Sequence, residues 1–158
     1  MQTQAASRRA DKHAQAFIFL RAMTMFAPFR SQATAYGHVQ VETGVAAADP
    51  HKLVEMLYDG ALDAMARARG ALARGDVEAK GAAIGQAVRI IEEGLRSALN
   101  KKDGGAVAES LDMLYLYLTT RLTYANLHND DAALQECVRL LAPVRDAWVT
   151  MKSSLKSL

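Results

Sequence analysis

Apolar residues recur every three or four positions from Pro50 almost to the end of the chain, and this spacing constrains the fold more than any other feature. Such a repeat is typical of amphipathic α-helices that bury one face. Asp49 can cap the first helix, and Pro50 suits the first helical position because its missing N–H would have had no partner there. Before this point Val39 and Val41 alternate with polar residues, as in an extended segment. The sequence therefore predicts an all-α domain preceded by an extended segment.

Local signals divide the apolar repeat into several helices. Gly75 can end the first helix, and Asp76 can cap the second. The polar stretch 100–105 contains two glycines and predicts a turn. A third helix is then expected from about residue 106 to residue 127.

A fourth helix can begin at Asp130 or Asp131. Pro143 interrupts its apolar repeat without changing the register, which predicts a kink rather than a break. Because the connections between the helices are short, successive helices should be antiparallel neighbours. The expected architecture is an all-α, antiparallel up-down four-helix bundle with an extended N-terminal cap segment.

Charge is distributed unevenly along the 158 residues. Residues 1–30 carry five basic residues and one acidic residue, whereas residues 31–158 carry 14 basic and 16 acidic residues. The basic stretch has no interleaved aromatic platform and no nucleic-acid motif, so no nucleic-acid partner is expected. No apolar run approaches the roughly 20 residues that span a bilayer, so no membrane insertion is expected. The single cysteine, Cys137, excludes an intrachain disulfide, fits a reducing compartment such as the cytoplasm, and should be a core residue.

Residues that would support catalysis, a metal ion or a cofactor are missing from the sequence. A di-iron bundle needs Glu-x-x-His pairs, and none occurs here. The four histidines lack metal-ligand spacing, and His51 is expected on the surface. No glycine-rich phosphate loop or nucleophile motif is present. We therefore expect a protein that is not an enzyme and has no cofactor or metal.

The predicted third helix is apolar on two faces, which is typical of a helix with a second partner. Met113, Leu116, Tyr117 and Tyr124 lie on its second face. Two interpretations of its tyrosines, and of Tyr58 on the first helix, remain open. They can be core residues whose hydroxyls reach the surface, or they can line a groove that accepts an amphipathic helix.

From about residue 25 to residue 151 the chain resembles the FliS-type flagellar secretion chaperones. The residues that carry the resemblance are Tyr36, 39–43, 50–53, 56–62, Ile90, Ile91, Leu95, Gly104, Gly105, Leu114, Tyr115, Tyr117, Leu118, Arg121, Leu122, 125–127, Asn129, Asp130 and Trp148. Residues 1–24 fall outside it. Residues 1–35 are therefore expected to be an N-terminal extension that is disordered or not native, helix-prone from 11 to 26 but outside the bundle. Residues 36–158 are expected to be the bundle domain with the cap segment 36–48.

The resemblance implies a cytoplasmic export chaperone. Members of that family bind the disordered C-terminal segment of flagellin, prevent premature polymerisation and assist export, and their N-terminal segment is thought to cover the binding groove. The expected groove and cap residues are Tyr36, Val39, Val41, Tyr58, Leu62, Ile91, Leu114, Tyr117, Tyr124 and Asn126. The alternative is a regulatory bundle that sequesters another flagellar or transcription-control factor, because both uses need the same kind of groove.

Overall fold

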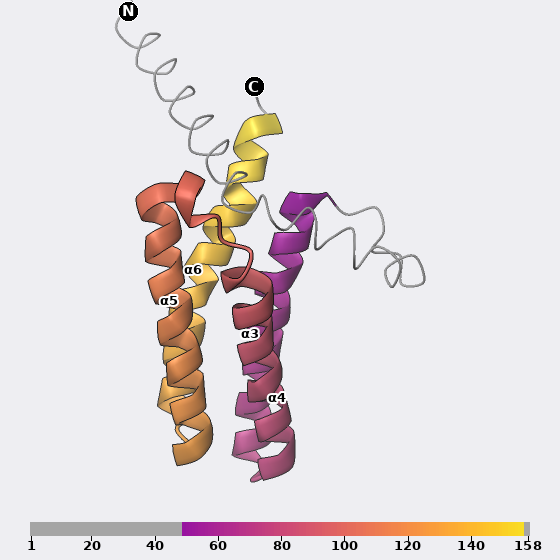
Figure 1. Ribbon diagram of the computed structural model, residues 1–158. Helices are drawn as coiled ribbons and strands as arrows, with labels where there is room; N and C mark the ends of the chain where they lie inside the picture. The colour runs from indigo at the N-terminus through magenta and orange to yellow at the C-terminus, as the bar shows by residue number, and fades with distance from the viewer. Residues whose placement is uncertain (1–48, 157–158) are drawn as a thin grey trace, which may run out of the picture.

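The computed structural model describes residues 49–156, which form helices packed into one bundle and no strand (Figure 1). The helices are α3 (Pro50–Ala73), α4 (Val77–Arg89), the π-helix η2 (Ile90–Arg96), which continues α4, α5 (Lys101–His128) and α6 (Asp131–Lys156). The all-α prediction is therefore confirmed. The cap segment 36–48 and the N-terminal extension lie outside the described residues.

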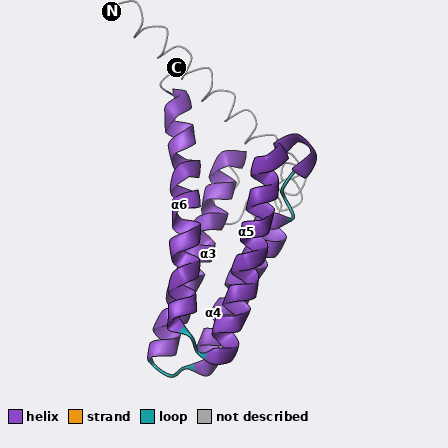
Figure 2. Ribbon diagram, turned by 90° about the vertical axis from the view of Figure 1, so that its left-hand side faces the viewer, coloured by secondary structure: helices purple, strands orange, loops and turns teal. Residues whose placement is uncertain are grey.

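Each long helix runs antiparallel to the one before it, with turns at alternating ends of the bundle (Figure 2). Helix α3 packs against α4 and α6, and α5 packs against the α4–η2 helix and α6. This is the predicted up-down arrangement, in which the first and last helices are neighbours.

The sequence signals at the helix ends have the predicted roles. The Asp49 carboxylate accepts a hydrogen bond of 2.7 Å from the backbone N–H of Lys52. The Asp76 carboxylate accepts one of 3.0 Å from the N–H of Ala79. Gly75 has a φ of +71°, a left-handed conformation that glycine adopts without steric cost. The boundaries of α3 and the start of α4 therefore follow from local sequence.

The predicted turn over residues 100–105 is wrong for most of its length. The Asn100 side chain accepts a hydrogen bond of 3.2 Å from the N–H of Asp103, so a helix already begins at Lys101. Gly105, with φ +55° and ψ −141°, then interrupts the helical backbone. The polar stretch is therefore a capped helical turn followed by a glycine kink, because Asn100 satisfies a first-turn N–H.

The core runs the full length of the bundle. Its largest fully buried side chains are Val54, Tyr58, Met65, Ile91, Leu95, Tyr115, Leu118, Leu122, Leu134, Cys137 and Leu141. Burial raises the pKa of the Cys137 thiol to about 12, as expected for a core cysteine. Helix α6 continues through Pro143, so the prediction that proline would not break it is confirmed.

Helix η2 lies close to α3. A Cβ atom on Gly94 would lie 3.0 Å from Leu57 Cδ2, so with a larger residue at position 94 the Leu57 side chain would have to shift. The π-helical turn itself, from Ile90, carried no sequence signal that we recognised. Like α4 before it, η2 packs against both α3 and α5.

Candidate protein-binding surface

The exposed side of α5 carries a line of apolar and aromatic side chains, which we name the α5 stripe. It consists of Met113, Leu116, Tyr117, Tyr124 and Leu127. Because they recur at helical spacing, these five residues share one face. Met113 is 65% exposed, Tyr117 46% and Leu127 78%. An apolar line of this kind on a soluble bundle is typical of a binding surface.

Hydrogen bonds and ring contacts fix the orientation of the stripe's two tyrosines. The Tyr117 hydroxyl donates to the Glu136 carboxylate on α6, and Arg121 Nε donates to the same carboxylate at 2.7 Å. These bonds lower the pKa of Glu136. The Arg121 guanidinium lies 4.9 Å from the centre of the Tyr124 ring, whose other neighbour is the stacked His128 ring at 4.0 Å. Side chains held in place before binding lose less conformational entropy when a partner docks.

The five predicted groove residues that remain at least partly exposed in the bundle fall into three groups. Tyr117 and Tyr124 lie on the α5 stripe. Leu62 and Leu114 are half-buried and pack against the core. Asn126 is half-buried, and its backbone carbonyl accepts a hydrogen bond of 2.8 Å from Lys80.

Tyr58 and Ile91, which we expected in the groove, are core residues. Ile91 is fully buried and Tyr58 is 1% exposed. The hydroxyls of Tyr58 and Tyr115 are 2.6 Å apart and share a hydrogen bond between α3 and α5, and burial raises the pKa of Tyr58 to about 12. Each of these two buried hydroxyls therefore has the other as its hydrogen-bond partner. Tyr58, Tyr115 and Ile91 are all inside the bundle and do not line an open groove. Tyr36, Val39 and Val41 lie outside the described residues.

Sequence reasoning placed Met113 and Leu116 on the second face of the helix but did not include them, or Leu127, among the predicted groove residues. The spacing of Leu127 could have indicated that it shares this face. Leu127 continues the line of Tyr117 and Tyr124 at i+10 and i+3, the spacing of neighbours along one helical face.

His51 and Trp148 join the start of α3 to α6, and we name this contact the clasp. His51 Nε2 donates to the Trp148 carbonyl at 2.8 Å, and Trp148 Nε1 donates to the His51 carbonyl at 2.9 Å. Their rings stack with centroids 4.6 Å apart. His51 is 4% exposed, so the prediction of a surface histidine is wrong. Near the clasp, Lys152 Nζ donates to the Asp49 carboxylate at 2.6 Å.

The clasp should make the stability of the bundle depend on pH. Burial lowers the pKa of His51 below its ordinary value of about 6.5. The unfolded chain therefore binds a proton at His51 more readily than the folded chain does. The contribution of His51 to the free energy of unfolding is fully present above about pH 6.5 and is lost as the pH falls towards the folded pKa. The melting temperature, followed by the fluorescence of the chain's single tryptophan, should therefore be constant above about pH 6.5 and decline as the pH falls below it.

His51→Gln is the control for this pH dependence, because its amide can still donate to the Trp148 carbonyl and does not titrate. The other histidines are the same in both proteins. The pKa of the neighbouring Asp49 is lowered by its hydrogen bond from Lys152, so its titration lies below this range. An equal decline in both proteins would exclude His51 as its cause.

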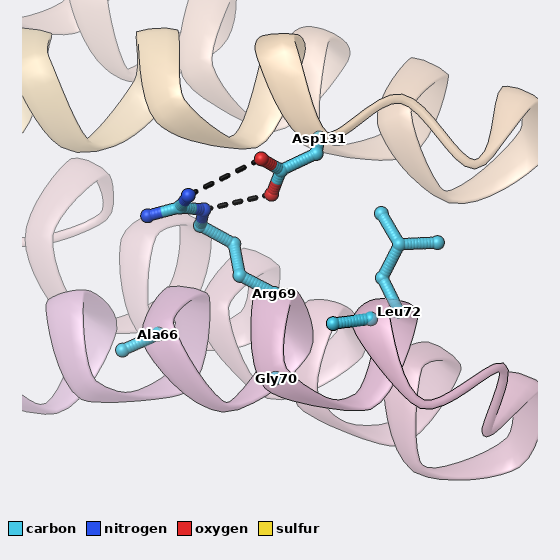
Figure 3. A pocket seen from close by; sticks show the side chains of 6 residues that line it. Ala66, Arg69, Gly70, Leu72 and Asp131 are labelled. Carbon is cyan, nitrogen blue, oxygen red and sulfur yellow. Dashed lines mark hydrogen bonds and ion pairs between the residues drawn. The ribbon is translucent and has the colours of Figure 1, made fainter.

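A hollow of about 510 Å³ lies where the end of α3 meets the start of α6. Figure 3 shows the Arg69 guanidinium and the Asp131 carboxylate facing each other there, with two hydrogen bonds of 2.7 and 3.2 Å. The remaining lining consists of Ala66, Gly70, Leu72 and Ala73. Because the two charges neutralise each other, the hollow offers no free charge to a ligand.

A metal site and a membrane-spanning helix are two further features that can be assessed within residues 49–156. No group of three or more histidine, cysteine, aspartate or glutamate side chains in this part of the chain is arranged to hold a metal ion. Among the same residues, none of the helices combines the length and the apolar character that crossing a membrane requires. The α5 stripe is therefore the strongest candidate for a functional surface.

Comparison with known proteins identifies the family. The model of the family described as flagellar protein FliS matches residues 32–155. The flagellar secretion chaperone FliS of Salmonella typhimurium is 47% identical over 114 residues, which cover 72% of this chain and 84% of that protein. FliSB of Pseudomonas aeruginosa is 43% identical over 72% of this chain and 89% of its own length, and FliS of Escherichia coli is 38% identical over 78% and 88%. The chain belongs to the FliS family of flagellar secretion chaperones, which are not enzymes.

Proposed function

We propose that this chain is a cytoplasmic export chaperone that binds the C-terminal segment of flagellin on the α5 stripe. The observation that carries the proposal is the exposed apolar line from Met113 to Leu127 on a bundle whose core is already complete. Family membership supports flagellin as the cargo, because flagellin is the client that the FliS resemblance implies. The chaperone would hold flagellin unassembled until export.

The dimensions of the α5 stripe suit an amphipathic helix. Met113 and Leu127 are 14 residues apart, which is about 21 Å along a helix. A cargo helix with apolar residues at i, i+3, i+4 and i+7 could cover this length. The mechanism is holding, because covering an apolar stripe on flagellin needs no nucleotide. Ordering a disordered cargo costs several kcal/mol of the contact energy. The complex is therefore weaker than its contact area suggests, so the chaperone can release flagellin for export.

The test is isothermal titration calorimetry with a peptide of the C-terminal segment of flagellin from the same organism. We expect a 1:1 complex and a negative heat-capacity change, because apolar surface is buried while the ligand folds. Leu116→Asp should abolish binding. Val77→Asp should not, since Val77 is exposed but lies on α4 and is not part of the stripe.

Failure of both this peptide and full-length monomeric flagellin to bind at roughly 50 μM would reject the proposal. Binding of a flagellar regulator, with no binding of flagellin, would instead support the alternative of a regulatory bundle. Both outcomes can be read in the same titration format.

We also propose that the cap segment 36–48 covers part of this surface in the free protein. The clasp and the Lys152–Asp49 bond fix the start of α3 beside α6, so the cap segment joins the bundle at that end. A chain that starts at residue 44 should therefore bind the flagellin peptide faster than one that starts at residue 36, because no cap must first leave. Stopped-flow fluorescence measures this rate. Slower or weaker binding by the shorter chain would make the cap a part of the docking surface instead.

A further inference from the structure

Lys80 of α4 is only 3% exposed, although a lysine is almost never fully buried unless its charge is paired. Its Nζ donates to the Asn126 carbonyl at 2.8 Å and to the side-chain oxygen of Asn129. Both acceptors are neutral, and among residues 49–156 no carboxylate forms an ion pair with this ammonium group. Burying a cation against neutral oxygens costs more desolvation free energy than burying an apolar side chain. Packing alone therefore does not explain a lysine at this position.

The two acceptors belong to the end of α5, at the same end of the bundle as the α3–α4 turn (Figure 2). Helix α5 ends at His128, and Asn129 follows in the left-handed conformation with φ +52°. The last carbonyls of a helix have no partner within that helix. Lys80 supplies a partner for one of them from α4, and its positive charge is favourable at the C-terminal end of the α5 dipole. Lys80 therefore caps α5 from a neighbouring helix.

The α5–α6 turn has local bonds that define it without this cap. The N–H groups of Asn129 and Asp130 both bond to the Ala125 carbonyl, the second at 3.1 Å. The Asp130 carboxylate accepts a hydrogen bond of 3.1 Å from the N–H of Ala133 and so caps the start of α6. These bonds specify where α5 ends and where α6 begins. What Lys80 adds is a fixed position of the last turn of α5 against α4.

The last turn of α5 carries the end of the α5 stripe. Leu127 is 78% exposed, more than any other stripe residue, and it lies between the two residues that Lys80 holds. His128, whose ring stacks on Tyr124, belongs to the same turn. Helix ends fray more readily than helix centres. Without Lys80, a cargo would therefore have to order this turn when it binds, which lowers the affinity.

We propose that Lys80 is a positioning residue for cargo binding, which holds the last turn of α5 so that Leu127 is ordered before the partner docks. Because Lys80 is buried, it acts through Leu127 and not by its own contact with the cargo. This role rests on the proposed function, since it concerns the binding of flagellin at the α5 stripe. The ordering of the turn in the free protein does not depend on flagellin.

A double-mutant cycle in the full-length chain tests this role. Lys80→Met keeps an unbranched stem and loses the ammonium group, so it should weaken binding of the flagellin peptide roughly tenfold. In a Leu127→Ala background the same substitution should weaken binding by roughly twofold or less, because the side chain that Lys80 positions is absent. Met113→Ala is the matched control background, since Met113 lies on the stripe but 14 residues from Leu127, and the tenfold loss should persist there. Lys80→Arg keeps a donor and a positive charge, so it should restore most of the affinity.

Hydrogen exchange without the peptide tests the ordering of the turn in the free protein. In Lys80→Met the amides of Leu127 and His128 should exchange roughly tenfold faster, whereas the amide of Leu116, in the middle of α5, should be unchanged. Asn129→Gly is a second variant, because it removes one of the two acceptors and keeps a residue that adopts the left-handed conformation. It should accelerate exchange at the same two amides, by a smaller factor.

Equal losses of affinity for Lys80→Met in all three backgrounds, or faster exchange at Leu116 as well, would overturn the proposal, because Lys80 would then support the bundle as a whole. Binding of the peptide with no effect of Lys80→Met would reject the role of Lys80 and keep the proposed function. If the peptide does not bind the unaltered protein, the cargo assignment fails. Local acceleration at Leu127 and His128 would then still support the ordering of the turn by Lys80, and unchanged exchange would reject it.

Discussion

Replacing Tyr117 by aspartate should abolish binding of the flagellin peptide and leave the bundle folded, whereas Leu118→Asp should unfold it. The two positions are adjacent, but Tyr117 is exposed on the α5 stripe and Leu118 is fully buried. A carboxylate at position 118 would have no partner in an apolar core, at a cost of several kcal/mol against a total stability of about 5–15 kcal/mol. Circular dichroism melting and calorimetry measure the two effects separately.

Tyr117→Phe is the control for this pair of variants. It removes the hydrogen bond to Glu136 and keeps the ring, so the fold should persist and binding should weaken only modestly. If Tyr117→Asp lowers the melting temperature as much as Leu118→Asp, Tyr117 supports the fold and must be removed from the proposed site. If Tyr117→Asp keeps full affinity, the cargo binds on another face.

The bundle could be predicted because its helix boundaries depend on local chemistry. Asp49 followed by Pro50, and Gly75 followed by Asp76, each define a helix end through their own backbone preferences. Apolar spacing then assigns one face of each helix to the core. The stretch 100–105 misled us because the same polar residues suit a turn and a helix cap, and Asn100 selects the cap.

The division of the tyrosines between core and surface could not be predicted from spacing alone. Tyr115 and Tyr117 are two positions apart on a helix with two apolar faces, and either face could have been the inner one. The way α5 packs in the bundle decides it, because it brings Tyr115 to Tyr58 of α3 and leaves Tyr117 outside. Contacts of this kind depend on residues far apart in sequence, for which a single sequence carries no direct signal.

His51 is the clearest case of such a long-range contact, since its partner is 97 residues away. In sequence it is a polar residue in a first helical turn, where exposure is the ordinary outcome. In the structure it joins α3 to α6 because Trp148 offers both a ring to stack on and a carbonyl to accept its N–H. The clasp is therefore a tertiary feature that helix-by-helix reading of the chain cannot reveal.

Trp148→Ala should be among the most destabilising single substitutions in the bundle. It removes a buried indole together with the stacking on His51 and the hydrogen bond to the His51 carbonyl. Truncating a buried tryptophan typically costs about 3–5 kcal/mol. For a bundle of this size, that corresponds to a fall in melting temperature of roughly 15 °C or more, measured by circular dichroism because the fluorescent probe is lost.

Trp148→Phe separates ring packing from hydrogen bonding. It keeps an aromatic ring against His51 but loses the indole N–H and part of the buried ring volume, so it should cost about 2 kcal/mol, less than Trp148→Ala. His51→Ala should fall between the two Trp148 variants, because it leaves the indole without its stacking partner but creates a smaller cavity. If Trp148→Ala melts within a few degrees of the unaltered protein, the end of α6 does not hold the start of α3. The position at which the cap segment joins the bundle would then be determined by α3 alone, through Asp49 and Pro50.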